Sequence, residues 1–143
     1  MIAIDTNILV YAHREDSPFH ERARTCVTEL ANGPLMWAMP WPCLHEFLAV
    51  LTNRRVYKPP TPMDLALAQA QKLIESDNCL LIGETDQHWK RLRMCIDGGI
   101  VGRRIHDAKI AAICVQHGVR EFWSADRDFS RFPELRTINP LVR

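Results

Sequence analysis

The sequence lacks an excess of charge of either sign. Its 143 residues include 18 Lys and Arg against 17 Asp and Glu, which leaves a formal net charge of +1. A chain so balanced does not bind nucleic acid through bulk electrostatic attraction, so any such binding depends on local basic patches. Hydrophobic residues make up 47% and charged residues 24%, the composition of a soluble globular domain.

Long apolar runs and a cysteine framework are also missing. No apolar run approaches the roughly 20 residues that cross a bilayer. The opening segment, Met1-Ile2-Ala3-Ile4-Asp5, reaches an acidic residue too soon for a secretory signal. The five cysteines are odd in number and include no C-x-x-C pair, as in a reduced protein. We expect a cytoplasmic protein that does not enter a membrane.

Internal repeats and low-complexity segments are absent as well. At this length a folded chain buries roughly 68–70% of its unfolded surface, enough for one core without disulfide or metal staples. Two full domains would be cramped. We therefore predict a single domain over residues 1–143.

Short apolar segments alternate with longer helical ones. The helix signals include a stop at Asn32-Gly33-Pro34 and a start at Pro42. Strands are predicted at 2–4, 35–39, 79–82, 121–125 and 136–138, and helices at 8–13, 19–30, 42–53, 63–75, 86–96 and 107–116. Strands separated by helices imply crossover connections. The predicted fold class is α/β, with a short, mainly parallel sheet flanked by helices on both faces.

Acidic residues follow two of the predicted strands. Asp5 comes directly after the first strand, and Asp126 and Asp128 follow the strand at 121–125. Ligands of parallel sheets gather outside the carboxyl ends of the strands, so these acids are expected at one edge. Asp107 opens the apolar helix at 107–116, where the helix dipole favours an anion. Glu46 is the lone acid in 43–51, opposite that helix's apolar stripe.

Each of these acids also has an ordinary structural interpretation. Asp5 has the position of a helix cap, and Asp107 that of a residue that interacts only with the helix dipole. Glu46 alone fits a solvated surface position. Asp126 and Asp128 fit a polar turn. The combination is the stronger signal, because independent arguments send three acids to one edge of one sheet.

Carboxylates that converge in one cleft repel each other unless a cation compensates them. Mg²⁺ and Mn²⁺ take oxygen ligands and usually engage substrate phosphates. Zinc is disfavoured, because the histidines and cysteines show no clustered ligand spacing. The chemistry indicated is the hydrolysis of a phosphoester.

Several ordered segments resemble a known family. They are Asp5-Thr6-Asn7, Pro40-Trp41-Pro42-Cys43-Leu44-His45-Glu46-Phe47, His106-Asp107-Ala108 with Ala111-Ala112, Ser124-Ala125-Asp126-Arg127-Asp128-Phe129, Phe132-Pro133-Glu134-Leu135 and Asn139-Pro140-Leu141. Asp5-Thr6-Asn7 is similar to the start of PIN domains. The later segments resemble the PIN-domain ribonuclease toxins of the VapC type, from toxin–antitoxin pairs. The resemblance covers essentially the whole chain.

The resemblance implies a catalytic acidic site that holds Mg²⁺ or Mn²⁺. Its ligands would be Asp5, Glu46 and Asp107, with Asp126 as the fourth acid and Asp128 close enough to take that place. Ser124 would supply a supporting hydroxyl, while Thr6 and Asn7 would orient the loop and its waters. The implied reaction is endonucleolytic cleavage of RNA by a metal-activated water.

The resemblance also implies partners. Members of the family are typically homodimers, held inactive by a cognate VapB-like antitoxin whose tail enters the acidic groove. An arginine from such a tail would compensate the carboxylates much as a metal does. Trp37, Trp41, Trp89 and Met36 are candidates for an interface, although we expect most of them to pack in the core.

A basic neighbourhood precedes Asp107. It consists of Lys90, Arg91, Arg93, Arg103 and Arg104. Such a patch beside a metal cleft would contact RNA phosphates and offset the negative potential of the cleft. A solvated helix face and loop is the alternative for any single member.

Other functions share part of this pattern. His106-Asp107 resembles the HD pair of metal phosphohydrolases, but the further histidine ligands are not evident. Phosphatases with an aspartate nucleophile need a second aspartate where Asn7 stands. A phosphatase or a DNA flap-type nuclease on a related fold remains an alternative. So does a non-catalytic module whose acidic groove binds a basic partner tail.

Overall fold

Parallel strands form one sheet in the computed structural model, which describes residues 1–96 and 98–142. Within those residues the strands are β1 (Ile2–Ile4), β2 (Trp37–Pro40), β3 (Cys79–Ile82), β4 (Glu121–Trp123) and β5 (Arg136–Ile138). Their order is β3-β2-β1-β4-β5, and each neighbouring pair is parallel. The α/β prediction is confirmed, and the described sheet is parallel throughout.

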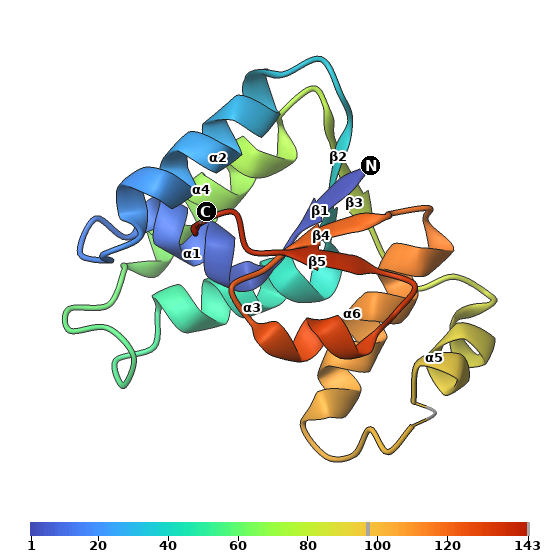
Figure 1. Ribbon diagram of the computed structural model, residues 1–143. Helices are drawn as coiled ribbons and strands as arrows, with labels where there is room; N and C mark the ends of the chain where they lie inside the picture. Colours follow the sequence, from blue (N-terminus) through green and yellow to red (C-terminus); the bar gives the residue numbers. More distant parts are fainter. Residues whose placement is uncertain (97, 143) are drawn as a thin grey trace.

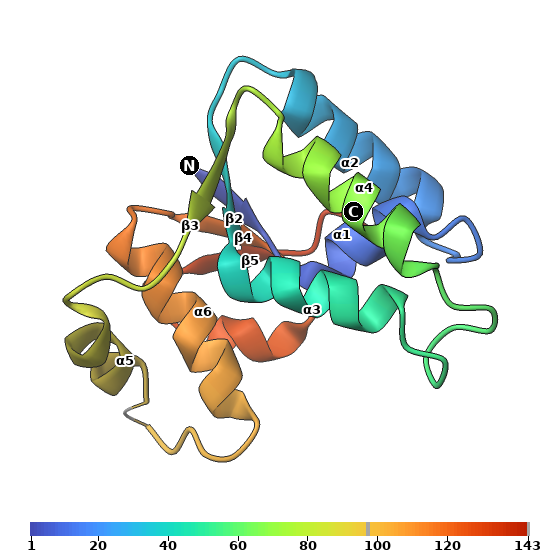
Figure 2. The same cartoon turned by 180° about the vertical axis from the view of Figure 1, so that it is seen from behind.

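Helices connect these strands and cover both faces of the sheet (Figures 1 and 2). They are α1 (Thr6–His13), α2 (His20–Asn32), α3 (Trp41–Leu51), α4 (Met63–Ile74), α5 (His88–Ile96) and α6 (Arg104–Gln116), with a short 3₁₀ helix, η1, at Arg127–Arg131. The predicted stop signal of α2 and start signal of α3 lie at the ends of these helices. Gly33 ends α2, and Pro42 lies in the first turn of α3, where its missing N–H costs no hydrogen bond.

Two hydrophobic cores lie on opposite sides of the sheet. Side chains alternate along a strand, so Ala3 faces the core that contains α6, and Ile4 faces the core that contains α1, α2 and α4. On β2, Ala38 joins the first core while Trp37 and Met39 join the second. In Figure 1, α1, α2 and α4 accordingly lie on one side of the strands and α6 on the other.

The strand order reverses between β1 and β4, and this reversal positions the site. The chain continues from β1 toward β2 on one side, while β4 and β5 pair on the other. Ile4 pairs with Trp123 at the last register position, and the Asp5 N–H donates to the Trp123 carbonyl at 2.9 Å. The residues after β1 and after β4 therefore leave the sheet side by side.

Several predicted boundaries shift by one to three residues in the structure, among them the start of α1 and both ends of β2 and α3, and two of the shifts bear on the site. Helix α6 begins at Arg104 rather than at residue 107, after Gly102, whose φ of +63° suits a glycine at the end of the preceding loop. Strand β4 ends at Trp123 rather than at residue 125. The Ser124 N–H still donates to the Ile138 carbonyl of β5 at 3.0 Å, but the Ala125 N–H turns into the site and donates to the Asn7 side chain. Asp126 therefore follows the strand after a short connection.

The expectation that most of four large apolar residues pack in the core is wrong. Trp37 is fully buried on the interior strand β2. Trp41, Trp89 and Met36 are 41%, 68% and 48% exposed, because they lie at the ends of elements rather than on faces that pack against the sheet. Among the described residues, no helix is long and apolar enough to cross a membrane.

Candidate functional site

A cavity of about 270 Å³ opens where the strand order reverses. Four of the five predicted acids line it: Asp5 after β1, Glu46 on α3, Asp107 on α6 and Asp126 after β4. Thr6 and Asn7, both predicted at this site, also line it. The structure thus brings acids from four separate parts of the chain to one cavity.

Asp5 is the most buried of these acids, with 5% of its surface exposed. Its carboxylate caps α1 by accepting the Thr6 N–H at 2.7 Å, so the capping interpretation holds alongside the functional one. The Ser124 hydroxyl donates to the other oxygen at 2.7 Å, and the Cys43 thiol lies 3.7 Å from the first. Burial, assisted by the charges of Glu46 and Asp126, raises the pKa of Asp5 to about 6.

Asn7 and Ser124 tie the segment after β4 to the start of α1. The Asn7 amide donates to Asp5 Oδ2 at 3.3 Å, and its carbonyl oxygen accepts the Ala125 N–H at 3.2 Å. Ser124 Oγ accepts the Asp126 N–H at 2.9 Å while it donates to Asp5. The two polar residues therefore hold Asp5 and Asp126 at a set separation.

Glu46 is exposed, yet it is not an isolated surface acid. The Thr6 hydroxyl lies 3.0 Å from the Cys43 carbonyl oxygen and 3.3 Å from Glu46 Oε2. Thr6 thus links the start of α1 to one turn of α3. This link orients the Glu46 carboxylate toward the cavity that it lines.

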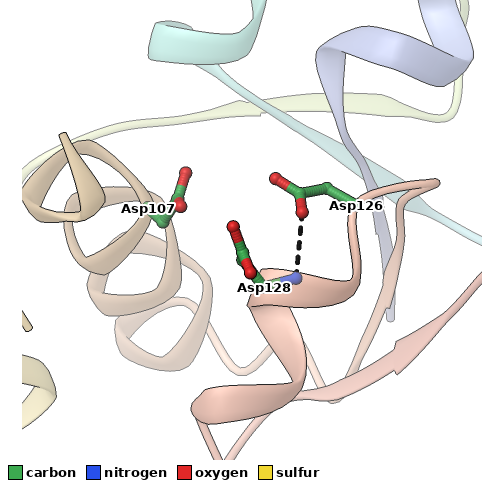
Figure 3. A group of neighbouring side chains, drawn as sticks. All are labelled: Asp107, Asp126 and Asp128. Atoms are coloured by element: carbon green, nitrogen blue, oxygen red, sulfur yellow. Dashed lines mark hydrogen bonds between the residues drawn. The ribbon is translucent and has the colours of Figure 1, made fainter.

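Asp107, Asp126 and Asp128 form a tight carboxylate group (Figure 3). One oxygen of each lies within 4.8 Å of the others. The Asp128 N–H donates to Asp126 Oδ1 at 2.9 Å, so the predicted polar turn begins η1 and presents both carboxylates to Asp107. Burial first, then the charges of Asp126, Asp128 and Glu46, raise the pKa of Asp107.

These donors fit a hard divalent cation. The group contains carboxylate oxygens only, which Mg²⁺ and Mn²⁺ prefer over the nitrogen and sulfur ligands of zinc. Burial, together with the neighbouring carboxylates, raises the pKa of both Asp5 and Asp107. A bound cation would relieve that repulsion, so the residues and the electrostatics agree.

The residues of the predicted basic neighbourhood lie in different places in the structure. Arg104 Nη2 lies 3.7 Å from Asp128 Oδ1, beside the carboxylate group, and the exposed Arg103 precedes it. Arg91 donates to Gln116 at the far end of α6, about 13 Å along the helix axis from Asp107. Arg93 is exposed on the same helix as Arg91. Among the described residues of this neighbourhood, Arg104 therefore contacts the carboxylate group, Arg103 precedes it in the chain, and Arg91 lies away from the acids.

The sequence reasoning missed the apolar and aromatic side of the cavity. Tyr11 lines it one turn after Asn7 on α1, a spacing that offered a usable signal. Tyr57 also lines it, from the proline-rich loop between α3 and α4, and Arg14 stacks on its ring at 4.2 Å. No local sequence pattern predicts that Tyr57 lines the cavity, because only the folded loop brings it there.

The fold and the site together define an α/β domain with a carboxylate cavity suited to a divalent cation. A family model extends this description: the chain belongs to the PIN domain family, whose model matches residues 2–135. The predicted family is thereby confirmed.

Relatives and solved structures agree with this assignment. The chain is 34% identical over 142 residues to VapC ribonuclease Mb2897 of Mycobacterium bovis, covering 99% of this chain and 96% of the relative. The crystal structure of Mycobacterium tuberculosis VapC20, a sarcin-ricin loop cleaving toxin, has the same fold, with a TM-score of 0.67 at 19% identity. The match covers 95% of this chain and 99% of the solved one. VapBC2 from Rickettsia felis was solved with a promoter DNA fragment. It matches with a TM-score of 0.67 at 19% identity, and the match covers 97% of this chain and 98% of the solved one.

Proposed function

We propose that this chain is a metal-dependent endoribonuclease, the toxin of a toxin–antitoxin pair. The observation that carries the proposal is the convergence of Asp5, Glu46, Asp107 and Asp126 on one cavity. Full-length similarity to VapC ribonuclease Mb2897 supports RNA as the substrate. The cofactor is Mg²⁺ or Mn²⁺, which the oxygen-only donors favour.

The roles follow from the contacts. Asp5, Glu46, Asp107 and Asp126 would hold the ion, which when bound supplies activation of water and stabilisation of phosphate charge. Ser124 and Asn7 fix Asp5 against Asp126, and Thr6 orients Glu46. Asp128 supplies a further carboxylate oxygen, or anchors Arg104 near the substrate phosphate.

The proposed protein partners are a cognate VapB-like antitoxin and a second copy of the chain. The neighbour VapBC2 of Rickettsia felis is a toxin–antitoxin complex, which supports a partner of this kind. The acidic cavity would accept a basic antitoxin side chain in place of the cation. RNA and antitoxin would then compete for one site.

Incubation of the purified protein with Mg²⁺ and either RNA, DNA or a phosphomonoester tests the proposal. We expect internal cleavage of RNA alone, abolished by EDTA and restored by Mg²⁺ or Mn²⁺. Cleavage of DNA or of the monoester instead would assign the cavity to another hydrolase. A protein that cleaves none of them but binds a basic peptide would be a binding module.

Replacement of Arg103 and Arg104 by Ala is expected to weaken RNA binding and to flatten its salt dependence. Each lost phosphate contact lowers the slope of log affinity against log salt by about 0.7 for a single strand. Fluorescence anisotropy over a salt series measures this slope. Arg93→Ala, which removes an exposed arginine of α5, is the matched control and is expected to leave the slope unchanged.

Asp126→Asn is expected to reduce cleavage far more than Asp128→Asn. Asp126 lines the cavity and is held through Ser124, whereas the side chain of Asp128 is 47% exposed and pairs with Arg104. We expect kcat/KM to fall on the order of 100-fold for Asp126→Asn and about tenfold or less for Asp128→Asn. The reverse order would make Asp128 the fourth ligand.

A further inference from the structure

A second cavity, of about 380 Å³, adjoins the acidic one. It lies between α3 and α6, and Glu46 and Ile110 line both cavities. The two cavities therefore adjoin across these two side chains, with the carboxylates on the side of the acidic cavity. None of the roles proposed above involves the second cavity.

The second cavity is built by two helix faces. On α3, Pro42, His45, Glu46 and Ala49 follow the spacing that places residues on one side of a helix. On α6, His106, Lys109 and Ile110 do the same. Both walls are regular helix, so the cavity is a fixed groove rather than a gap in a loop.

Apart from Glu46, which it shares with the acidic cavity, the polar lining of the second cavity carries no acid. Lys109 carries a positive charge, and His45 and His106 offer ring N–H groups. Within residues 1–96 and 98–142, none of these three side chains has a salt bridge or hydrogen bond to another protein group. Their donors are thus free for a ligand that carries acceptor oxygens.

An aromatic pair extends the α3 wall. The His45 ring lies 6.0 Å from the ring of Trp41, one turn earlier, and the two planes are tilted by 34°. Trp41 is 41% exposed although it is a large apolar residue. An exposed aromatic face beside the unpaired Lys109 ammonium is the combination on which single-stranded nucleic acid stacks its bases and places its phosphates.

We propose that this groove binds the nucleotide next to the scissile phosphodiester, with Lys109 on its phosphate and the His45–Trp41 pair against its base. The inference rests on the proposed function, because it assigns RNA to the adjoining acidic cavity. The volume falls within the range of about 300–1,000 Å³ for small-molecule sites, which suits one nucleotide. The groove would then determine which base stands beside the cleaved bond.

Lys109→Ala tests the phosphate contact, with Lys72→Ala on the exposed face of α4 as the matched control. The probe is a single-stranded RNA oligonucleotide that spans a site cleaved by the wild-type protein, bound in EDTA so that cleavage does not interfere. We expect Lys109→Ala to lower the salt slope by about 0.7 and Lys72→Ala to leave it unchanged. With metal present, KM should rise while kcat stays close to the wild-type value.

The double replacement of His45 and Trp41 by Ala tests the base contact. We expect RNA affinity to fall about tenfold and the preference for the base beside the cleavage site to relax. Trp41→Phe retains an aromatic face and is expected to keep most of the affinity. Thermal unfolding of each variant separates these effects from loss of the fold.

Three outcomes are distinguishable. A wild-type protein that cleaves no RNA would overturn the proposed function itself. A wild-type protein that cleaves RNA, with Lys109→Ala equal to Lys72→Ala in slope and affinity, would overturn only the nucleotide groove. Unchanged RNA binding together with weakened binding of the antitoxin would assign the groove to the protein partner and would likewise overturn the inference.

Discussion

Asp107→Asn is expected to remove RNA cleavage while the protein keeps its fold. Asp107 contributes one of the three oxygens that lie within 4.8 Å of one another, and it also lines the acidic cavity. An amide of the same shape retains the packing but loses the negative charge that holds a divalent cation. Loss of several kcal/mol of metal-derived stabilisation corresponds to a fall in kcat/KM on the order of 100-fold or more.

The measurement is the mapping of RNA cleavage sites in cells that express the protein without a partner. Asp64→Asn is the matched control, because Asp64 also lies in the first turn of a helix, α4, but is exposed and lines none of the described cavities. We expect the wild type and Asp64→Asn to give the same cleavage sites and the same toxicity, and Asp107→Asn to give neither. Toxicity retained in Asp107→Asn would mean that the acids act only as a docking surface.

Asp5→Asn is expected to stabilise the metal-free protein at neutral pH while it abolishes cleavage. The pKa of Asp5 is about 6 in the folded protein, against an ordinary value of 3.8. Two pKa units correspond to about 3 kcal/mol, and loss of the Ser124 and Asn7 hydrogen bonds to Oδ2 offsets about 2 kcal/mol of that. We therefore expect a net gain of about 1 kcal/mol in the free energy of unfolding above pH 7.

The sign of the pH dependence follows from the raised pKa. Between pH 3.8 and 6 the folded protein binds more protons at Asp5 than the unfolded chain does. The contribution of Asp5 to stability is therefore complete below pH 3.8 and is lost as the pH rises through 6. Asparagine does not titrate, so the variant should lack this loss.

Urea unfolding in EDTA at several pH values between 4 and 8 measures the difference between the two proteins. We expect equal stability, or a small deficit for Asp5→Asn, near pH 4, and the full gain above pH 7. Addition of Mg²⁺ should stabilise the wild type far more than the variant, because binding to the folded state alone adds stability. A gain that does not change with pH would show that the Asp5 charge is not its cause.

Local signals were sufficient for the order of the elements and for part of the site. The apolar segments predicted the strands, and the acids that follow β1 and β4 were expected at one edge because parallel strands end together. Asp5 and Asp126 lie there. Asp107 could be placed from its position in the first turn of α6, which packs on the sheet.

Contacts between distant segments could not be predicted in the same way. The link from Thr6 to Glu46 depends on how α1 and α3 pack, and nothing in either segment encodes their separation. The hydrogen bond from the Arg91 side chain to Gln116 likewise depends on how α5 packs against α6. The exposure of Trp41 was missed because hydrophobicity predicts burial only on average, not for a residue at the end of an element.

The distribution of the acids along the chain has a consequence for biosynthesis. Asp5 and Asp126 lie near opposite ends of the polypeptide, yet both line one cavity. At roughly 5–20 residues per second, a ribosome needs roughly 6 to 24 seconds to translate from the first of these codons to the last. The acidic cavity can therefore form only after Asp126 has been translated and has left the ribosome.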